Sequence, residues 1–354
     1  MSAEKVLVGM SGGVDSTAAV MLLLKSGYCV SGVTMEVAPE GVPGGNSCYG
    51  AEDIPAIKDL ARRLGISHAA LDLRAEYSAF VLAYFKSEYA AGRTPNPCVM
   101  CNRQVKFGAL LEKAAASGLA FDKFATGHYV RLERDASGRI LLRQGRDSKK
   151  DQSYFLWNIP RQRFERVLFP LGDLTKDEVR ELAASAGFRD LAEKPESQDF
   201  APPEAMEELL DGGRPGNIVD ASGAVCGRHK GISRYTVGQR KGLGMGGLEE
   251  PLFVSAINSS DNTVVVSPKS ELSRKIVRLR AMNWVSTDAP SGPVKVSVKI
   301  RRQHEPAPAR FLPENESCGT VEFEQGQFAP TPGQSAVLYD GEVLLGGGII
   351  EAAA

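Results

Sequence analysis

Long hydrophobic runs are missing from this sequence of 354 residues. No stretch approaches the ~18 consecutive apolar residues of a membrane helix, and the apolar run at 6–10 is too short for a signal peptide. Cysteine is also scarce, with six residues, which excludes a disulfide scaffold in a chain of this length. We therefore expect a cytoplasmic protein without a membrane partner, in which a close cysteine pair indicates metal or redox chemistry.

A strong net charge is absent too. The formal net charge is −1, which argues against a general nucleic-acid binder. The charge is nevertheless uneven: residues 269–310 carry ten Lys and Arg against three acidic residues, whereas the chain from Phe311 onward has seven acidic residues and no Lys or Arg. This basic band is suited to a phosphate backbone, and a solvated basic surface is the alternative.

The length predicts two or three domains, and the first half alternates strands and helices. We expect strands at 6–10, 28–37, 68–73 and 121–126, and helices at 17–26, 54–64, 76–91 and 103–117. Thr175 and Glu178 form a capping box for a further helix. Strands separated by helices predict an α/β domain with a parallel sheet.

A different pattern begins after about residue 205. Turn pairs such as Asp340-Gly341 separate short alternating strands, including 294–300 and 336–345. This portion is therefore expected to be all-β and to contain a small barrel. A hairpin is also expected earlier, at 129–134 and 139–143.

The strongest motif is Ser11-Gly12-Gly13-Val14-Asp15-Ser16, between an expected strand and an expected helix. Backbone N–H groups in such a turn, with the helix N-terminus, form an anion cradle that glycines let phosphate approach. Asp15 is suited to Mg²⁺, and Ser11 and Ser16 can donate hydrogen bonds. The motif is neither a Walker A loop nor a dinucleotide fingerprint. It resembles the pyrophosphatase loop of enzymes that cleave ATP between the α and β phosphates, and a tight turn without a ligand is the alternative.

The second motif is the proline-rich stretch from Thr94 to Asn102, which contains Cys98 and Cys101. Its two prolines stiffen the loop, and a following helix would stabilise a thiolate through its N-terminal dipole. Cys-x-x-Cys at a helix start fits metal, cluster or disulfide chemistry, and two buried thiols packing as small hydrophobes are the alternative.

These motifs, with others in the same order, give a family resemblance that covers essentially the whole chain. The further motifs are Thr126-Gly127-His128-Tyr129, Lys150-Asp151-Gln152-Ser153-Tyr154-Phe155-Leu156, Phe169-Pro170-Leu171-Gly172, Lys194-Pro195-Glu196-Ser197-Gln198, Tyr235-Thr236-Val237-Gly238-Gln239-Arg240-Lys241-Gly242-Leu243 and Pro332-Gly333-Gln334. Together they resemble tRNA-specific 2-thiouridylases, which use ATP to replace an oxygen of a tRNA uridine with sulfur. The resemblance implies an α/β domain of the ATP pyrophosphatase (HUP) type at 1–204, a mostly β linker domain at 205–275 and a tRNA-contacting β-barrel at 276–354.

The resemblance also implies the roles of individual residues. ATP, with Mg²⁺, would lie along Gly9, Met10, Ser11, Gly12, Gly13, Val14, Asp15 and Ser16, with Met35 and Gly127 near the adenosine. Asn96, Pro97 and Cys98 would meet the flipped target base, and Cys101 would be the nucleophilic thiol. Further tRNA contacts would come from His128, Lys150, Asp151, Gln152, Arg301, Arg302 and Gln334. Taken singly, Met35 is also typical of a core residue and His128 of a buried imidazole.

Two departures from the family pattern leave the sulfur step open. Cys98 stands where the family commonly has Asp, and Ala201 stands where it has a second catalytic cysteine. The remaining candidates among the six cysteines are Cys48, Cys98 and Cys101, and three thiolates could hold a 4Fe–4S cluster with one iron open for hydrosulfide. A persulfide and disulfide cycle of Cys98 and Cys101 is the alternative. The sulfur donor would be a cysteine desulfurase relay or inorganic sulfide.

Two other functions remain as alternatives to a tRNA sulfurtransferase. One is an adenylating ligase that uses the same loop on a small molecule, against which the basic band and the long β portion argue. The other is a tRNA-binding protein whose active site has decayed, which Ala201 suggests.

Overall fold

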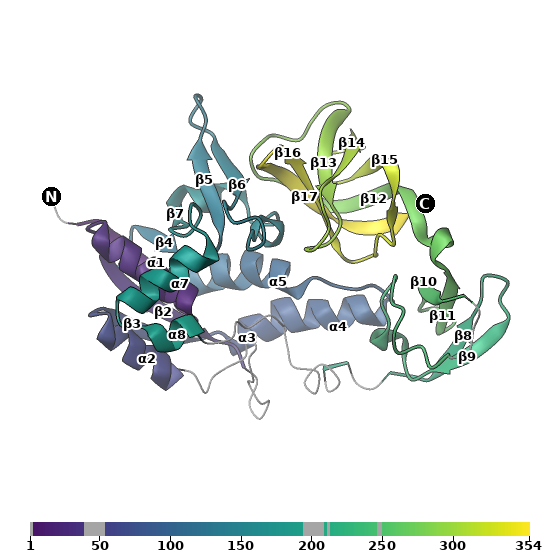
Figure 1. Cartoon of the computed structure of the whole chain (residues 1–354), viewed down its shortest axis with the longest axis horizontal. Coiled ribbons are helices and arrows are strands. Elements are labelled where there is room, and N and C mark those ends of the chain that lie inside the picture. The colour runs from purple at the N-terminus through teal and green to yellow at the C-terminus, as the bar shows by residue number, and fades with distance from the viewer. Residues whose placement is uncertain (1–2, 39–53, 194–208, 211–212, 246–249) are drawn as a thin grey trace.

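The computed structural model describes residues 3–38, 54–193, 209–210, 213–245 and 250–354. Helices gather around the sheet that holds the N-terminus, and the later strands lie toward the opposite end of the molecule (Figure 1). This arrangement confirms an α/β domain followed by β-rich domains.

The α/β domain contains a five-stranded parallel sheet in the order β3-β2-β1-β4-β7. Val6, Leu7 and Val8 of the central strand are fully buried, as expected where helices cover both faces of a parallel sheet. Its strands are β1 (Lys5–Gly9), β2 (Cys29–Glu36), β3 (Ser67–Asp72), β4 (Lys123–Ala125) and β7 (Val167–Leu168).

Helices of this domain follow the sequence-based expectation, with one correction. The expected helix at 103–117 begins earlier, at Pro97, so Cys98 and Cys101 lie within the helix and not before it. Asn96 followed by proline is a favoured helix start, which explains the difference. The helices are α1 (Val14–Lys25), α2 (Ile54–Arg63), the run α3 (Arg74–Tyr77), η2 (Ser78–Leu82) and α4 (Ala83–Ala90), the run α5 (Pro97–Met100), η3 (Cys101–Ala109) and α6 (Leu110–Ala116), the short turns η4 (Ser153–Phe155) and η5 (Arg161–Arg166), then α7 (Lys176–Ser185) and α8 (Arg189–Glu193). The capping box of Thr175 and Glu178 is confirmed at the start of α7.

Two β-rich units follow. The first is a four-stranded sheet in the order β10-β11-β8-β9, and the second is a six-stranded antiparallel barrel, β12-β15-β14-β13-β16-β17, closed by pairing of β12 with β17. The strands and turns are β8 (Gly216–Val219), β9 (Val225–His229), η6 (Ile232–Arg234), β10 (Leu252–Asn258), β11 (Thr263–Pro268), η7 (Lys269–Leu272), β12 (Ser273–Trp284), β13 (Val294–Lys299), β14 (Ala307–Pro313), β15 (Gly319–Phe328), β16 (Ser335–Asp340) and β17 (Val343–Ala353). The single strand expected at 336–345 is wrong, because the chain turns at Asp340 and Gly341 and returns as β17.

The hairpin of β5 (Val130–Arg134) and β6 (Ile140–Gln144) joins the α/β domain to the barrel. Strand β6 pairs with β17 through Arg143 with Val343 and Leu142 with Leu344. One hydrophobic core accordingly includes Phe107 of the α/β domain, Leu142 of the hairpin and Tyr339 of the barrel. The α/β domain and the barrel therefore share a core.

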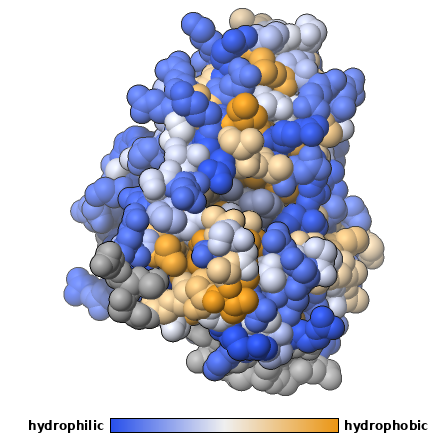
Figure 2. All heavy atoms as spheres, turned by 90° about the vertical axis from the view of Figure 1, so that its right-hand side faces the viewer, coloured by the Kyte–Doolittle hydropathy of each residue, from blue (hydrophilic) through white to orange (hydrophobic). Residues whose placement is uncertain are grey.

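The outer surface of the β-rich end is mixed in character. Figure 2 shows small apolar areas separated by hydrophilic side chains, and Val225 and Ile276 are exposed apolar residues of these units. Across the ranges that the structure describes, no helix combines the length and apolar character needed to cross a membrane.

Candidate active site

The loop between β1 and α1 forms a tight turn at the expected place, and we refer to residues Ser11–Ser16 as the cradle. Gly12 has a φ of +74°, and a Cβ there would lie 2.9 Å from Ile57, so the turn requires glycine. The Ser16 hydroxyl accepts from the backbone N–H of Ser11 at 3.3 Å and donates to the Gly13 carbonyl at 3.1 Å, which fixes the shape of the loop. Ser11 itself is exposed at the rim.

Asp15 has partners that the sequence did not predict. Its Oδ1 accepts from the Lys176 ammonium at 2.7 Å and from the Tyr129 hydroxyl at 2.7 Å. The Lys176 side chain is only 5% exposed, and that of Asp15 is 31% exposed. A carboxylate inside an anion cradle is therefore balanced by a lysine from α7, and its second oxygen, Oδ2, is the one suited to a cation.

Gly127, which the resemblance places near the adenosine, lies against the loop at Ser11–Ser16. A Cβ at this position would lie 2.9 Å from the carbonyl carbon of Asp15 and 3.0 Å from the backbone nitrogen of Ser16. Met35 is half-buried on β2, and the preceding Thr34 donates to the Met10 carbonyl at 2.8 Å. Strand β2 and residue 127 thus border the same loop, next to Gly9, Met10 and Val14.

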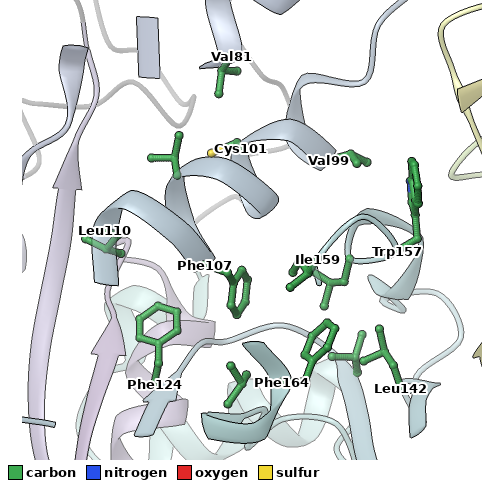
Figure 3. Close-up of a cluster of buried hydrophobic side chains, with 14 of the residues drawn as sticks. Val81, Val99, Cys101, Phe107, Leu110, Phe124, Leu142, Trp157, Ile159 and Phe164 are labelled. Atoms are coloured by element: carbon green, nitrogen blue, oxygen red, sulfur yellow. The ribbon is translucent and has the colours of Figure 1, made fainter. Parts of the chain in front are cut away.

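The two cysteines lie three residues apart on the helix that begins at Pro97, so they share a face of that helix. Cys98 is half-buried in the first turn, and Cys101 is buried. Figure 3 shows Cys101 on this helix, with Phe107 reaching from it toward Phe124; the rings of Phe107 and Phe124 are 5.5 Å apart. From Cys101 to Ala109 the helix is a π-helix, a form found frequently at functional sites.

The segment before this helix is held by the barrel. The Gln334 side-chain amide donates to the Thr94 carbonyl at 3.1 Å and to the Pro95 carbonyl at 3.0 Å. Asn96 is buried, with its side chain at the hydroxyl of Tyr154, which in turn donates to the Ser335 carbonyl at 3.0 Å. Asn96, Pro97 and Cys98 are therefore placed together, and Gln334 contacts the same segment.

His128 is buried beside aromatic rings. Its Nδ1 lies 2.7 Å from the Thr126 hydroxyl, and its ring is 6.0 Å from that of Phe107. Burial, together with the charge of Lys106, lowers the pKa of the His128 imidazole well below its ordinary value. The imidazole is therefore neutral at neutral pH, and any tRNA contact it makes is that of an uncharged ring.

Residues 150–152 connect the hairpin to the cradle. The Asp151 carboxylate accepts from the backbone of Gly145 and Ser153 at 3.1 Å each and from the Ser153 hydroxyl at 2.9 Å. Gln152 accepts from the backbone N–H of Tyr129 at 3.0 Å. The side chains of Asp151 and Gln152 thus accept hydrogen bonds from the protein backbone. The neighbouring Lys150 is half-buried.

Arg301 and Arg302 are exposed on the barrel. The Arg302 guanidinium lies 5.9 Å from the centre of the Phe155 ring, and the Phe155 carbonyl accepts from Asn102 at 3.2 Å. Within the described ranges neither arginine has a carboxylate partner. Two other cations of the basic band are paired, Arg278 with Glu314 and Arg280 with Glu88.

Cys48 and Ala201 lie outside the described residues, so the three-thiol arrangement is not visible. In the parts of the chain that are described, no group of three or more His, Cys, Asp or Glu side chains is arranged to hold a metal ion. Only Cys98 and Cys101 of the three candidate ligands are placed.

Lys176 and Tyr129 are the residues that sequence reasoning missed. Tyr129 ends the Thr126–Tyr129 motif, which was a usable indication. Lys176 stands 161 residues from Asp15 and looked only like the first residue of a capped helix. No local pattern indicates which acid such a lysine meets.

Comparison with known proteins covers nearly the whole chain. Three family models match in order: a tRNA methyl transferase HUP domain at 4–201, a tRNA methyl transferase PRC-barrel domain at 206–268 and an aminomethyltransferase beta-barrel domain at 274–350. A protein of Endomicrobium trichonymphae is 42% identical over 98% of both chains, and one of Heliobacterium modesticaldum is 43% identical over 98% of this chain and 92% of its own. Both relatives are named tRNA-specific 2-thiouridylase MnmA.

Among solved structures, a 4-thiouridine synthetase in complex with RNA and ATP shows a distant, partial likeness. It has 21% identity and a TM-score of 0.38 over 59% of this chain and 50% of its own. The assignment therefore rests on the sequence relatives and the three family models. The chain belongs to the tRNA-specific 2-thiouridylase family.

Proposed function

We propose that this chain is an ATP-dependent tRNA-uridine 2-sulfurtransferase that forms 2-thiouridine at the wobble position. The observation that carries the proposal is the pairing of a phosphate cradle with a two-thiol helix in one chain of this family. The loop at Ser11–Ser16 is built for a nucleotide, and Cys98 and Cys101 begin the helix at Pro97. The barrel that holds this helix would also receive tRNA.

The first step activates the uridine. Its C2 oxygen attacks the α phosphorus of ATP, the bond between the α and β phosphates breaks, and pyrophosphate leaves. Phosphate oxygens would accept hydrogen bonds from the backbone N–H groups of the cradle, from those at the start of α1 and from the Ser11 hydroxyl. Lys176 offsets the charge of Asp15, which would otherwise repel the nucleotide. Gly127 has no side chain and therefore allows its backbone to lie against the loop, where a Cβ would meet the backbone of Asp15 and Ser16.

The second step transfers sulfur. A sulfur nucleophile attacks C2 of the adenylated base, the C2–O bond breaks and AMP departs, so that a poor leaving group has become a good one. The base must leave its stack to reach these groups, and Asn96, Pro97 and Cys98 border the space for it. We assign the sulfur chemistry to Cys101 with Cys98 beside it on the same helix face. The outer sulfur of a Cys101 persulfide attacks C2. The Cys98 thiolate then attacks the Cys101 sulfur, so that the S–S bond breaks, the outer sulfur stays on C2 and a Cys98–Cys101 disulfide forms.

Neither Mg²⁺ nor a 4Fe–4S cluster is needed to place these residues. The Oδ2 atom of Asp15 fits a magnesium ion that accompanies ATP. Cys98 and Cys101 would be two of the three thiolate ligands of a cluster, and the third, Cys48, lies outside the described residues. We assign sulfur transfer to the thiol pair. A desulfurase relay would pass persulfide sulfur to the Cys101 thiol after a thiol reductant has opened the Cys98–Cys101 disulfide, whereas sulfide would open this disulfide itself and leave a Cys101 persulfide and the Cys98 thiol.

The proposed tRNA-facing residues come from both the α/β domain and the barrel. Arg301 and Arg302 would pair with phosphates, and Lys150 would add a third cation. We also propose a cytoplasmic location, where ATP and tRNA meet, and domain limits of 1–204, 205–275 and 276–354.

The test is ATP–pyrophosphate exchange and nucleoside analysis of tRNA. Wild-type enzyme should show exchange stimulated by tRNA, and Asp15→Ala and Ser11→Ala should abolish both exchange and 2-thiouridine formation. Asp177→Ala, an exposed carboxylate next to Lys176, serves as the control. Exchange stimulated by small acids or amides would favour a small-molecule ligase, and tRNA binding without exchange would indicate a decayed site.

A further inference from the structure

The side-chain amide of Gln334 donates hydrogen bonds to two backbone carbonyls. Its amide nitrogen carries two N–H groups and faces two backbone carbonyls, those of Thr94 and Pro95, at 3.1 and 3.0 Å. Only the NH2 end of a carboxamide can face two carbonyl oxygens, so chemistry alone fixes its orientation. Both donors are therefore in use, and a phosphate, which only accepts hydrogen bonds, could not bind Gln334 without breaking them.

The turn that carries Gln334 is itself fixed to the barrel. The backbone N–H of Gly333 donates to the Ile350 carbonyl at 2.8 Å, and the N–H of Ile350 donates back to the Gln334 carbonyl at 2.8 Å. Gly333 has a φ of +90°, and a Cβ there would lie 2.8 Å from the Thr94 carbonyl. The Thr94 N–H in turn donates to the Pro332 carbonyl at 2.8 Å. The barrel thus forms hydrogen bonds with both the N–H and the carbonyl of Thr94.

The four-stranded sheet domain contacts the same residue. The Thr94 hydroxyl donates to that of Thr236 at 3.1 Å, and Thr331 of the barrel turn donates to the Val237 carbonyl at 3.2 Å. A Cβ at Gly92 would lie 3.0 Å from the Ile257 carbonyl. Residues 92–95 are therefore the place where all three parts of the chain meet.

An ion cluster completes the attachment. Glu88 on α4 has a side chain that is 7% exposed, and it pairs with Arg93 at 2.6 Å and with Arg280 of β12 at 3.2 Å. Arg93 directly precedes Thr94. The helix before the segment, the segment itself and the barrel are thus joined at one carboxylate.

These contacts bear on the positions of Cys98 and Cys101. Pro95 and Pro97 stiffen the two-residue connection to the helix, so movement of Thr94 is passed on to the helix start. Cys98 follows Pro95 by three residues, and Cys101 by six. We propose that Gln334 is a positioning residue, which holds the Thr94–Pro95 backbone so that the barrel sets the place of Cys98 and Cys101. The catalytic consequence rests on the proposed function, whereas the positioning itself does not.

Gln334→Met tests the proposal, since it keeps the length of the side chain and removes both donors. In the free enzyme, without ATP or tRNA, the rates of iodoacetamide alkylation at Cys98 and Cys101 should change at least about threefold, as measured by peptide mass analysis. With tRNA, kcat should fall about tenfold or more while the dissociation constant for tRNA stays within about twofold of wild type. Gln334→Glu should act in the same direction, because carboxylate oxygens repel the two carbonyls.

Two controls accompany the test: other cysteines in the same variant, and a variant at another glutamine. Alkylation of the exposed Cys29 and Cys226 should not change, which shows that the effect is confined to the thiol helix, and an unchanged circular dichroism spectrum shows that the variant is folded. Gln325→Met, at an exposed glutamine of the same barrel, should match wild type throughout. Unchanged Cys98 and Cys101 alkylation in both Gln334 variants would overturn the positioning role, whether or not tRNA binding weakens. If no variant or wild-type enzyme thiolates tRNA, the alkylation result still decides the positioning role and only the proposed function fails.

Discussion

The nucleotide cradle and the thiol helix differ in how they are built. The cradle comes from one short stretch between β1 and α1, whose shape is set by its own glycines and the Ser16 hydroxyl. The thiol helix begins at Pro97 in a segment that contacts the barrel, the four-stranded sheet domain and Glu88. The loop is thus shaped mainly by its own residues, whereas the place of the thiol helix depends on contacts with the barrel, the four-stranded sheet domain and α4.

Removal of the buried thiol should separate the two regions most completely. Cys101→Ser should reduce 2-thiouridine formation to below about 1% of wild type, because the oxygen replaces the nucleophile of the second step. ATP–pyrophosphate exchange stimulated by tRNA should persist, since the cradle is untouched. Loss of exchange as well would show that the two regions do not act independently, and Cys318→Ser, in the barrel, is the matched control.

The lysine that reaches the cradle from α7 tests whether the cradle is fully local. Lys176→Met should raise the ATP dissociation constant about tenfold, or ~1.4 kcal/mol, because Asp15 then presents an unbalanced negative charge to the phosphates. The double variant Lys176→Met with Asp15→Asn should recover ATP binding without recovering catalysis. Lys25→Met, at an exposed lysine of α1, should leave ATP affinity unchanged. Equal ATP affinity in Lys176→Met and wild type would contradict this account.

The basic band should affect tRNA binding alone. Arg301→Ala with Arg302→Ala should weaken tRNA binding and lower the slope of log K against log salt by about 1 for each phosphate that is no longer neutralised. ATP binding and Cys101 alkylation should match wild type. An unchanged slope would return these arginines to a solvated surface, and Arg189→Ala on α8 serves as the control.

Acid should loosen the attachment of the thiol segment. Burial alone would raise the pKa of the Glu88 carboxyl, but hydrogen bonds from Arg93 and the charges of Arg93 and Arg280 outweigh it and lower the pKa below the ordinary 4.5. A group with a lowered folded-state pKa stabilises the fold above its unfolded pKa, and this stability is lost as the pH falls through the folded pKa. Glu88→Gln should therefore lower Tm by about 2 °C or more at pH 7. The difference from wild type should shrink below pH 4.5; a difference that is constant with pH would rule out the carboxylate as its cause.

Much of this architecture was predictable because it depends on short-range patterns. The strand 6–10, the Gly-rich turn and the helix after it follow from local hydrophobicity and glycine placement, and the capping box at Thr175 was confirmed at the start of α7. The helix start at Pro97 was missed although Asn96-Pro97 is a local indication. The break at Asp340 and Gly341 is likewise a recognisable turn pair, but the apolar residues on both sides of it also fit one continuous strand.

What the sequence determined by itself is the set of chemical groups: a glycine-rich turn suited to an anion, two thiols three residues apart, and a confined basic band. Only the tertiary structure decided which groups meet. Lys176 reaches Asp15 across 161 positions, Gln334 reaches Thr94 across 240, and β6 pairs with β17 to join the domains. The physical reason is that hydrogen bonds and ion pairs depend on distance in space, which hydrophobic periodicity along the chain does not encode. The sequence identifies the two thiols, and the contact of the barrel with the segment before their helix determines their position.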